Sequence, residues 1–233
     1  MSKAMKSVIK RVRFPLDIML TCVRWYLAYA LSLRNLEEMM QERGVFVDHS
    51  TIHRWVIKLT PVLEDAFRKR KRKRGIGAVG DSWRLDETYV KILGEDRYWY
   101  RAVDKQGNTV DFLLTAKRDR RAARRFFTRA VIFNGAPRVA NIDKSGANKA
   151  GIEDFNRENG TDVLIRQCKY LNNIVEQDHR AVKRRTRPML GFKEFRSARI
   201  ILGGIELMHM IRKGQMVGGK KLTPAEQFYS LAA

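Results

Sequence analysis

The apolar residues of this chain change their spacing once, and that change restricts the folds open to it. Up to about residue 62 they recur every three or four positions, which is the period of helices that bury one face. A glycine-containing stretch at 75–80 follows, and after it the apolar residues gather in short strand-like runs. The first three runs are 82–92, 97–104 and 109–116, and later segments alternate between helix and strand. We therefore expect an all-α N-terminal domain followed by an α/β core, with a mixed sheet flanked by helices.

Three helices are expected before the glycine-containing stretch, at 16–31, 33–43 and about 50–59, and Pro61 is expected to open a further short helix. Gly44 is a good C-terminal stop for the second helix. Two helices joined by a short turn are typical of a helix-turn-helix, in which the later helix reads DNA. The side chains expected to contact bases or phosphates are Ser50, Thr51, His53, Arg54 and Lys58, together with His49. An ordinary three-helix bundle with a polar surface is the alternative.

The chain is strongly basic, with 47 lysines and arginines against 25 aspartates and glutamates and a formal net charge of +22. This excess favours a polyanionic partner, with nucleic acid first and an acidic membrane surface second. The basic run 68–74 is expected to be a solvated linker, an arm that lies along DNA phosphates, or both. No uncharged stretch approaches the roughly 20 residues of a membrane span. A cytoplasmic protein with no membrane partner is expected.

Three acidic residues lie in segments where a carboxylate is unusual. Asp86 lies inside the run 83–90, Asp143 ends the run 138–143, and Glu176 lies in a helix-like stretch that is otherwise basic. A carboxylate among apolar strand residues is unfavourable unless its charge is used. If the first and fourth strands are neighbours, Asp86 and Asp143 can meet, and a divalent cation would relieve their repulsion. The three residues predict a site for Mg²⁺ or Mn²⁺, with two ions acting on a phosphodiester.

The helix that carries Glu176 also shows basic groups. His179, Arg180 and Lys183 follow at helical spacing and are candidates for binding a phosphate backbone. A simpler explanation is a surface helix in which Glu176 only pairs with Arg180.

The other acids have simpler explanations too. Asp86 could be a core residue with hydrogen-bond partners, and Asp143 could be a helix N-cap. Glu87 is expected on the opposite sheet face, Asp104 in a turn, and Asp178 on a different helix face from the glutamate two residues earlier. These last three acids are therefore weaker candidates for metal binding than Asp86, Asp143 and Glu176.

Several short segments are informative in combination. They are Asp-Glu-Thr-Tyr-Val (86–90), Tyr-Arg-Ala-Val-Asp (100–104), Asp-Phe-Leu-Leu-Thr (111–115), Asp-Lys-Ser (143–145), Asn-Asn-Ile-Val-Glu-Gln-Asp-His-Arg (172–180) and His-Ser-Thr-Ile-His-Arg-Trp-Val (49–56). Together they resemble the DDE transposases of small bacterial insertion sequences, in the family that moves by replicative cointegrate formation. The resemblance runs from about residue 16 to about residue 215.

This resemblance implies a ribonuclease H-like catalytic core in which Asp86, Asp143 and Glu176 bind the metal ions. Lys183, seven positions after the glutamate, would bind a phosphate near the cut. The implied activity is that of a DNA transposase, which cleaves at the ends of an insertion sequence and joins the 3′-hydroxyl to target DNA. The helix-turn-helix would recognise the terminal inverted repeats. Because two ends must be brought together, a homodimer or a larger homo-oligomer is expected.

The expected domains are a helix-turn-helix domain at 1–62, a basic linker at 63–80, a catalytic core at 81–215 and a C-terminal tail at 216–233. The protein would be cytoplasmic and associated with the bacterial nucleoid. A non-catalytic helix-turn-helix DNA-binding protein, either a repressor or an inactive transposase remnant, is the alternative function. A basic RNA-binding protein is a third interpretation, which the lack of aromatic RNA-binding motifs weakens. The last clear helix, at about 192–213, could serve core packing or subunit contact.

Overall fold

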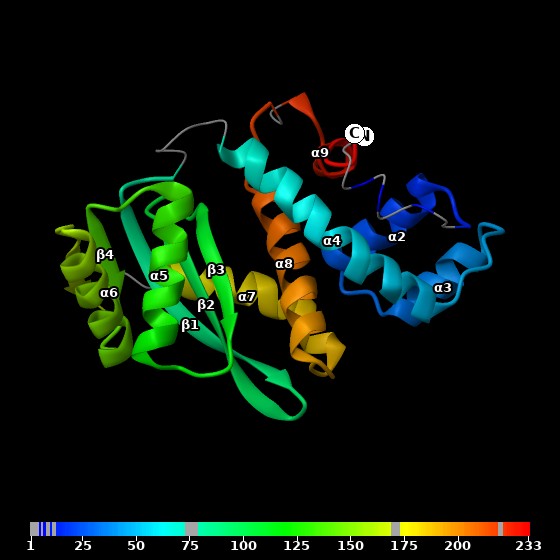
Figure 1. Ribbon diagram of the computed structural model, residues 1–233. Coiled ribbons are helices and arrows are strands. Elements are labelled where there is room, and N and C mark those ends of the chain that lie inside the picture. Colours follow the sequence, from blue (N-terminus) through cyan, green and yellow to red (C-terminus); the bar gives the residue numbers. More distant parts are fainter. Residues whose placement is uncertain are drawn as a thin grey trace. The chain divides into compact units, whose positions relative to one another are not determined.

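The computed structural model describes residues 5, 7, 10, 13–72, 79–168, 173–218 and 221–233. The chain divides into two compact units, which Figure 1 shows in sequence colours. One unit consists of Met1–Lys73 with Val182–Ala233, and the other of Arg74–Ala181. The described secondary structure of the first unit is helical, and the second unit holds the sheet. The domain boundaries expected from the sequence stay a prediction.

The helix-turn-helix segment consists of α3 (Leu33–Gln41) and the start of α4 (His49–Arg72), and α2 (Leu16–Ala28) precedes them. Ser32 caps α3, because its hydroxyl accepts a hydrogen bond of 3.0 Å from the Asn35 amide. Gly44 follows α3 with a φ of +72°, a left-handed conformation that favours glycine. The structure has these helices close to where the apolar spacing predicts them.

Helix α4 is longer than the sequence predicts, because it continues through Pro61 to Arg72. The helix carries three fully buried side chains at helical spacing on either side of the proline, Leu59, Leu63 and Phe67. Packing of this apolar face offsets the hydrogen bond that a proline cannot donate, so no new helix begins there. The segment expected as a linker is therefore helical up to Arg72, and the end of the basic run, 73–74, lies outside the described residues.

The C-terminal helices complete the first unit. They are the 3₁₀ helix η2 (Arg187–Met189), α8 (Phe195–Arg212) and α9 (Pro224–Ser230). Helix α8 packs against α2 and α4. At Gly204 a Cβ atom would lie 2.6 Å from the methyl carbons of Leu27 and 2.8 Å from Cγ2 of Thr60. The glycine therefore permits a close approach of three helices, and α8 contributes to the core of this unit.

The second unit is built on a five-stranded mixed sheet. Its strands are β1 (Ser82–Ile92), β2 (Glu95–Asp104), β3 (Thr109–Thr115), β4 (Val139–Ile142) and β5 (Leu164–Gln167). Their spatial order is β3-β2-β1-β4-β5, with the first three antiparallel and β1, β4 and β5 parallel. This strand order, with helices on the sheet, confirms the ribonuclease H-like α/β architecture expected for the core.

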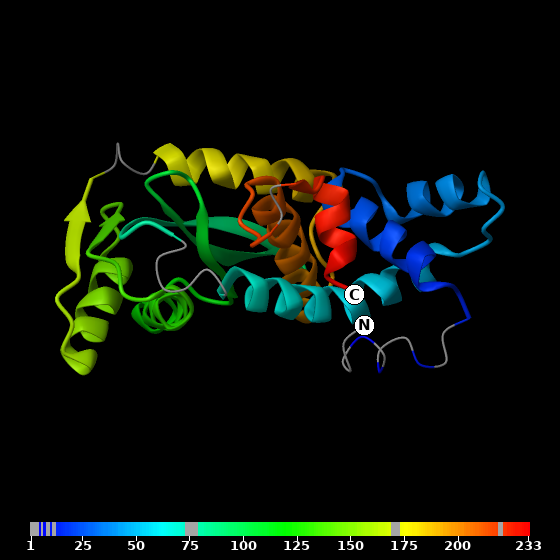
Figure 2. The same cartoon turned by 90° about the horizontal axis from the view of Figure 1, so that it is seen from above.

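Helices cover the sheet from two sides. Helices α5 (Arg120–Asn134) and α6 (Gly146–Asn159) pack against each other and enclose the apolar core, to which Leu85 of β1 and Ile142 of β4 contribute. Figure 2 shows α5 on one side of the sheet and α7 (Asn173–Thr186) on the other. The residues that alternate with Leu85 and Ile142 along their strands therefore face away from the α5–α6 core.

Candidate active site

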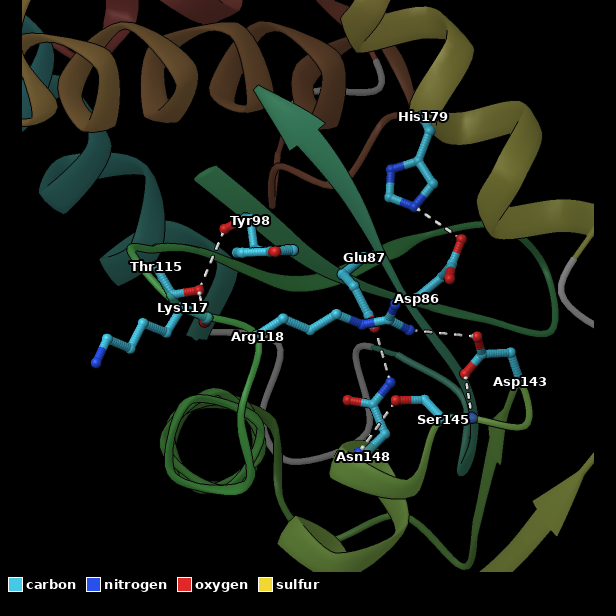
Figure 3. Close-up of polar contacts among 10 residues, drawn as sticks. All are labelled: Asp86, Glu87, Tyr98, Thr115, Lys117, Arg118, Asp143, Ser145, Asn148 and His179. Atoms are coloured by element: carbon cyan, nitrogen blue, oxygen red, sulfur yellow. Dashed lines mark hydrogen bonds and ion pairs between the residues drawn. The ribbon is translucent and has the colours of Figure 1, made fainter. Parts of the chain in front are cut away.

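Two of the predicted metal ligands lie on neighbouring strands. β1 and β4 run parallel, with Arg84 paired to Asn141. Asp86 and Asp143 follow two residues later in each strand direction, so continuing the register sets them side by side where β4 ends. Figure 3 shows both carboxylates at this end of the sheet, with Asp86 directed toward His179. The expectation that the first and fourth strands are neighbours is confirmed.

Helix α7 is joined to the sheet by two side-chain contacts. Nη2 of Arg101 on β2 lies 2.6 Å from Oδ2 of Asp178, and both side chains are buried. One residue further along α7, Nε2 of His179 lies 3.2 Å from Oδ2 of Asp86 (Figure 3). Arg101 is the cross-strand partner of Asp86, so these polar side chains share one face of the sheet. The two contacts fix the rotation of α7 about its own axis and hold the Asp86 carboxylate.

Glu176 lies in the first turn of α7, and its side chain is exposed. It stands three residues before His179, and residues three apart on a helix are surface neighbours. Within the described ranges, no three His, Cys, Asp or Glu side chains are grouped closely enough to hold a metal ion. The structure thus brings Asp86 and Asp143 to one end of the sheet but does not bring Glu176 into a cluster with them.

The opposite face of β1 holds another carboxylate, Glu87, whose side chain is only 4% exposed. Its Oε2 accepts a hydrogen bond of 2.9 Å from Nδ2 of Asn148 on α6, and its Oε1 forms an ion pair with Nε of Arg118. Nη2 of the same guanidinium lies 3.6 Å from Oδ2 of Asp143. Arg118 therefore bridges a buried carboxylate and one of the predicted metal ligands (Figure 3).

The backbone after β4 also holds Asp143. Its Oδ1 accepts a hydrogen bond of 2.9 Å from the amide of Ser145. Ser145, rather than Asp143, is the N-cap of α6, because its hydroxyl accepts a hydrogen bond of 3.5 Å from the Asn148 amide. The simpler explanation of Asp143 as a helix cap is therefore wrong, and both of its oxygens have partners at the sheet edge.

The charges at this site act on one another. Burial raises the pKa of Glu87 above its usual range, the Asn148 hydrogen bond and the Arg118 charge oppose that rise, and the negative charges of Asp143 and Asp86 add to it. Partial burial lowers the pKa of Arg118, but Glu87 and Asp143 raise it more. Three carboxylates thus lie within electrostatic reach of one another, with one guanidinium between two of them.

The basic residues predicted on α7 differ in exposure. Arg180 is exposed and Lys183 is half-buried, so both can still reach solvent. His179 was expected to face a phosphate, but it is buried and contacts Asp86 instead. Arg180 has no ion pair with Glu176 in the part of the chain that the structure describes, so the simpler explanation of that glutamate is not seen.

The helix-turn-helix residues fall into two groups. Asp48 accepts hydrogen bonds from the hydroxyls of Ser50 and Thr51, and from the Thr51 amide at 2.9 Å, and thereby caps α4. These bonds lower the pKa of the Asp48 carboxyl. Arg54 donates a hydrogen bond of 2.6 Å to the Thr51 hydroxyl. Ser50 and Thr51 therefore have structural partners as well as a predicted DNA contact.

The other α4 residues predicted to contact DNA have different surroundings. Both Lys58 and Arg54 are exposed. Nδ1 of His49 lies 2.8 Å from Oε2 of Glu37 on α3. His53 lines a cavity of about 630 Å³ together with Tyr26, Arg185 and Phe192, among others. The exposed cations of α4 are therefore better placed for a phosphate contact than His53.

Comparison with known proteins identifies the family. Residues 80–215, more than half of the chain, match the DDE domain of the IS240 transposase type. The transposase for the insertion sequence-like element IS431mec of Staphylococcus aureus is 36% identical over 206 residues, covering 86% of this chain and 87% of that protein. The chain belongs to the DDE transposases of bacterial insertion sequences.

Two further proteins are similar to this chain. The transposase for insertion sequence element IS257 in transposon Tn4003 of Staphylococcus aureus is also 36% identical over 206 residues, with the same coverage. Among solved structures, the catalytic core domain of BIV integrase is 18% identical, covers 65% of this chain and 95% of that chain, and gives a TM-score of 0.44. The resemblance to the DDE transposases of insertion sequences seen in the sequence is confirmed by the family match and by the two transposases, and this chain is a DNA transposase.

The transposase site includes residues that the sequence did not single out. Glu87 lies on the other sheet face, as the alternation along its strand predicts, but its partners Arg118 and Asn148 are not among the predicted site residues. Arg118 lies in an arginine-rich stretch with no distinguishing pattern. Asn148 could have been found, because it follows the N-cap serine of α6 by three residues, on the turn that faces β1.

A DDE domain implies dependence on a divalent metal. The donors at the sheet edge fit such an ion, because Mg²⁺ prefers carboxylate oxygens and needs only one or two of them beside water and phosphate oxygens. Asp86 and Asp143 are the two carboxylates at this edge that could hold it (Figure 3). No helix in the described part of the transposase is both long and apolar enough to span a membrane.

Proposed function

We propose that Asp86, Asp143 and Glu176 are the catalytic carboxylates with which this transposase cuts DNA at insertion-sequence ends and joins the 3′-hydroxyl to target DNA. The observation that supports the proposal is the parallel register of β1 and β4, in which Arg84 is paired with Asn141, because that register continued by two residues leads to Asp86 and Asp143. Glu176 is assigned from its position on α7, one turn before the histidine that contacts Asp86.

Asp86 and Asp143 would hold Mg²⁺ or Mn²⁺, with two ions and with Glu176 completing the coordination. Such ions would offset the negative charge of the phosphodiester and of the leaving oxygen. The chain itself orients the ligands. His179 holds Asp86 at 3.2 Å, and the Ser145 amide holds Oδ1 of Asp143 at 2.9 Å, so each carboxylate has one oxygen that is not used by that contact.

The basic surfaces support a role in holding DNA. Arg180 and Lys183 on α7 would bind phosphates near the cut, because both cations can reach solvent. The start of α4 would read the terminal inverted repeat, with Arg54 and Lys58 on phosphates or bases. Ser50, Thr51 and His53 would add contacts from the same helix start, whereas His179 is reassigned from DNA to Asp86.

The remaining parts of the proposal concern organisation. We propose that the helix-turn-helix lies within 1–62 and the catalytic core within 81–215, joined by the segment 63–80 and followed by a tail at 216–233. Two element ends and a target must meet, so the active form would be a homodimer or a larger homo-oligomer on DNA. The enzyme would act in the bacterial cytoplasm at the nucleoid.

The test is cleavage and strand transfer on a DNA duplex that carries the element's terminal inverted repeat, with Mg²⁺, with Mn²⁺ and with EDTA. Asp86→Asn, Asp143→Asn and Glu176→Gln should each lower the rate by roughly a thousandfold or more while DNA binding in a gel-shift assay is kept. Asp96→Asn and Glu153→Gln are matched controls, because both acids are exposed and pair only with exposed lysines. These controls should cut at the wild-type rate.

Each outcome decides one part of the proposal. If Glu176→Gln cuts normally while both aspartate variants fail, the assignment of Glu176 is wrong and the aspartate pair stands. If the wild type binds the end but cuts with neither metal, the protein is a non-catalytic DNA-binding remnant, which its family membership does not favour.

A further inference from the structure

Hydrogen bonds hold the backbone turn that carries Arg118, whose side chain extends toward the proposed catalytic carboxylates. It lies between β3 and α5, in a turn that Thr115 closes by donating its hydroxyl to the Lys117 carbonyl at 2.8 Å. The same hydroxyl lies 3.4 Å from the carbonyl of Tyr98 on the neighbouring strand (Figure 3). The backbone that carries Arg118 is therefore tied to the sheet, and the direction of its side chain is restricted.

Glu87 fixes the guanidinium from the buried side. The carboxylate has two partners, Nδ2 of Asn148 at 2.9 Å and Nε of Arg118. A carboxylate that is 4% exposed is strongly destabilised as a charge unless a cation accompanies it. Arg118 supplies that cation with its Nε, which leaves its outer nitrogens directed away from the buried face.

One of those outer nitrogens reaches a proposed metal ligand. Nη2 of Arg118 lies 3.6 Å from Oδ2 of Asp143, whereas Oδ1 of the same carboxylate accepts the Ser145 amide. A divalent cation at Asp143 would draw on Oδ2 as well, because that oxygen is the one without a backbone bond. Arg118 and a metal ion are both positively charged, so they would compete for Oδ2 of Asp143.

We propose that Arg118, anchored by Glu87, is a positioning residue that competes with the divalent cation for Oδ2 of Asp143 and so sets the metal affinity of this transposase. The inference rests on the proposed function, because it takes Asp143 to be a metal ligand. It goes beyond that function by assigning the control of metal occupancy to a residue outside the three carboxylates.

The competing explanation is that Arg118 only stabilises the turn between β3 and α5. The two explanations predict opposite signs. Loss of a competing cation tightens metal binding, whereas loss of a stabilising contact loosens the site and weakens metal binding. Both Arg118 and Asp143 are 36% exposed, so solvent screening limits the effect to about fivefold in the dissociation constant.

The test is Mn²⁺ binding to the full chain without DNA, followed by the electron paramagnetic resonance signal of free Mn²⁺. Arg118→Gln should bind Mn²⁺ about fivefold more tightly than the wild type. Arg118→Lys should lie between the two, because it keeps the charge but loses the fork that spans two carboxylates. Arg121→Gln is the matched control for net charge, since Arg121 is exposed and has no ion pair in the described residues.

Two more variants separate the possible failures. Asp143→Asn should weaken Mn²⁺ binding, and if it does not, the proposed metal site itself fails. Glu87→Gln removes the negative charge that shares Arg118 with Asp143, so the guanidinium is left to Asp143 alone and Mn²⁺ binding should weaken, which is opposite to the effect of Arg118→Gln. If Asp143→Asn weakens binding while Arg118→Gln leaves it unchanged, matches Arg121→Gln, or weakens it, the competition is refuted and the metal site stands.

Discussion

The close approach of α5 and α6 at Gly151 allows a quantitative prediction about stability. A Cβ atom at this position would lie 2.8 Å from the backbone nitrogen of Arg124 and 3.0 Å from Cβ of Ala123. Both distances are shorter than the separation at which non-bonded atoms attract. A backbone nitrogen cannot rotate aside as the end of a side chain can, so Gly151→Ala must push the two helices apart.

The magnitude follows from two opposing contributions. Overpacking of a buried contact costs about 1–3 kcal/mol, and alanine recovers up to about 1 kcal/mol over glycine inside a helix. Taking the middle of both ranges, the net loss in the free energy of unfolding is about 1–2 kcal/mol. For a chain of this size that loss corresponds to a fall in Tm of about 2–8 °C.

Thermal unfolding followed by circular dichroism measures this difference. Gly146→Ala is the matched control, because it lies in the same helix and its Cβ would meet no atom within 4 Å. The control should be as stable as the wild type or slightly more stable. If Gly151→Ala is as stable as the wild type, or if both variants lose the same amount, the contact at Gly151 does not limit the helix spacing and the reasoning is refuted.

Three other predictions follow from the site. Asp178→Asn should lower the free energy of unfolding by about 3 kcal/mol in urea, because it removes the carboxylate 2.6 Å from the fully buried Arg101. The pKa of Glu87 is raised in the folded protein, so ionisation of Glu87 opposes folding. The free energy of unfolding of the wild type should therefore fall relative to that of Glu87→Gln as the pH rises from about 4 to 7. A difference between the two that stays constant with pH would contradict this. Lys58→Gln should weaken DNA binding equally for all sequences and reduce the salt slope by about 1, whereas Arg138→Gln, which already pairs with Asp81, should change it less.

The arrangement of Asp86 and Asp143 could be predicted from the sequence because it depends on strand order and alternation. A buried parallel strand that ends in an aspartate next to a strand with an aspartate inside it leaves few other arrangements. Asp104 was likewise predicted as a turn residue, and its carboxylate accepts the amides of Gln106 and Asn108 at 2.9 and 2.8 Å. Both are local consequences of periodicity and turn chemistry.

Other features could not be predicted, because they depend on packing between distant segments. The continuation of α4 through Pro61 requires the burial of Leu63 and Phe67 by other helices, which no local rule contains. The burial of His179 against Asp86 depends on the rotation of α7, which Arg101 fixes from another strand. The position of Arg118 depends on the turn between β3 and α5, and nothing in the sequence distinguishes this arginine from the other basic residues.

The parallel register of β1 and β4, which precedes Asp86 and Asp143 by two residues, also has a consequence for how copies of such an element lose activity. Turns such as 93–94 and 105–108 can gain or lose residues without moving either carboxylate, because the turns lie outside the β1–β4 pairing. A single residue inserted in β1 before Asp86, or in β4, would instead turn every later side chain of that strand to the other face. With the proposed catalytic carboxylates, a one-residue length change inside either strand would therefore mark a copy that can no longer move on its own, even where all three acidic residues are still present in its sequence.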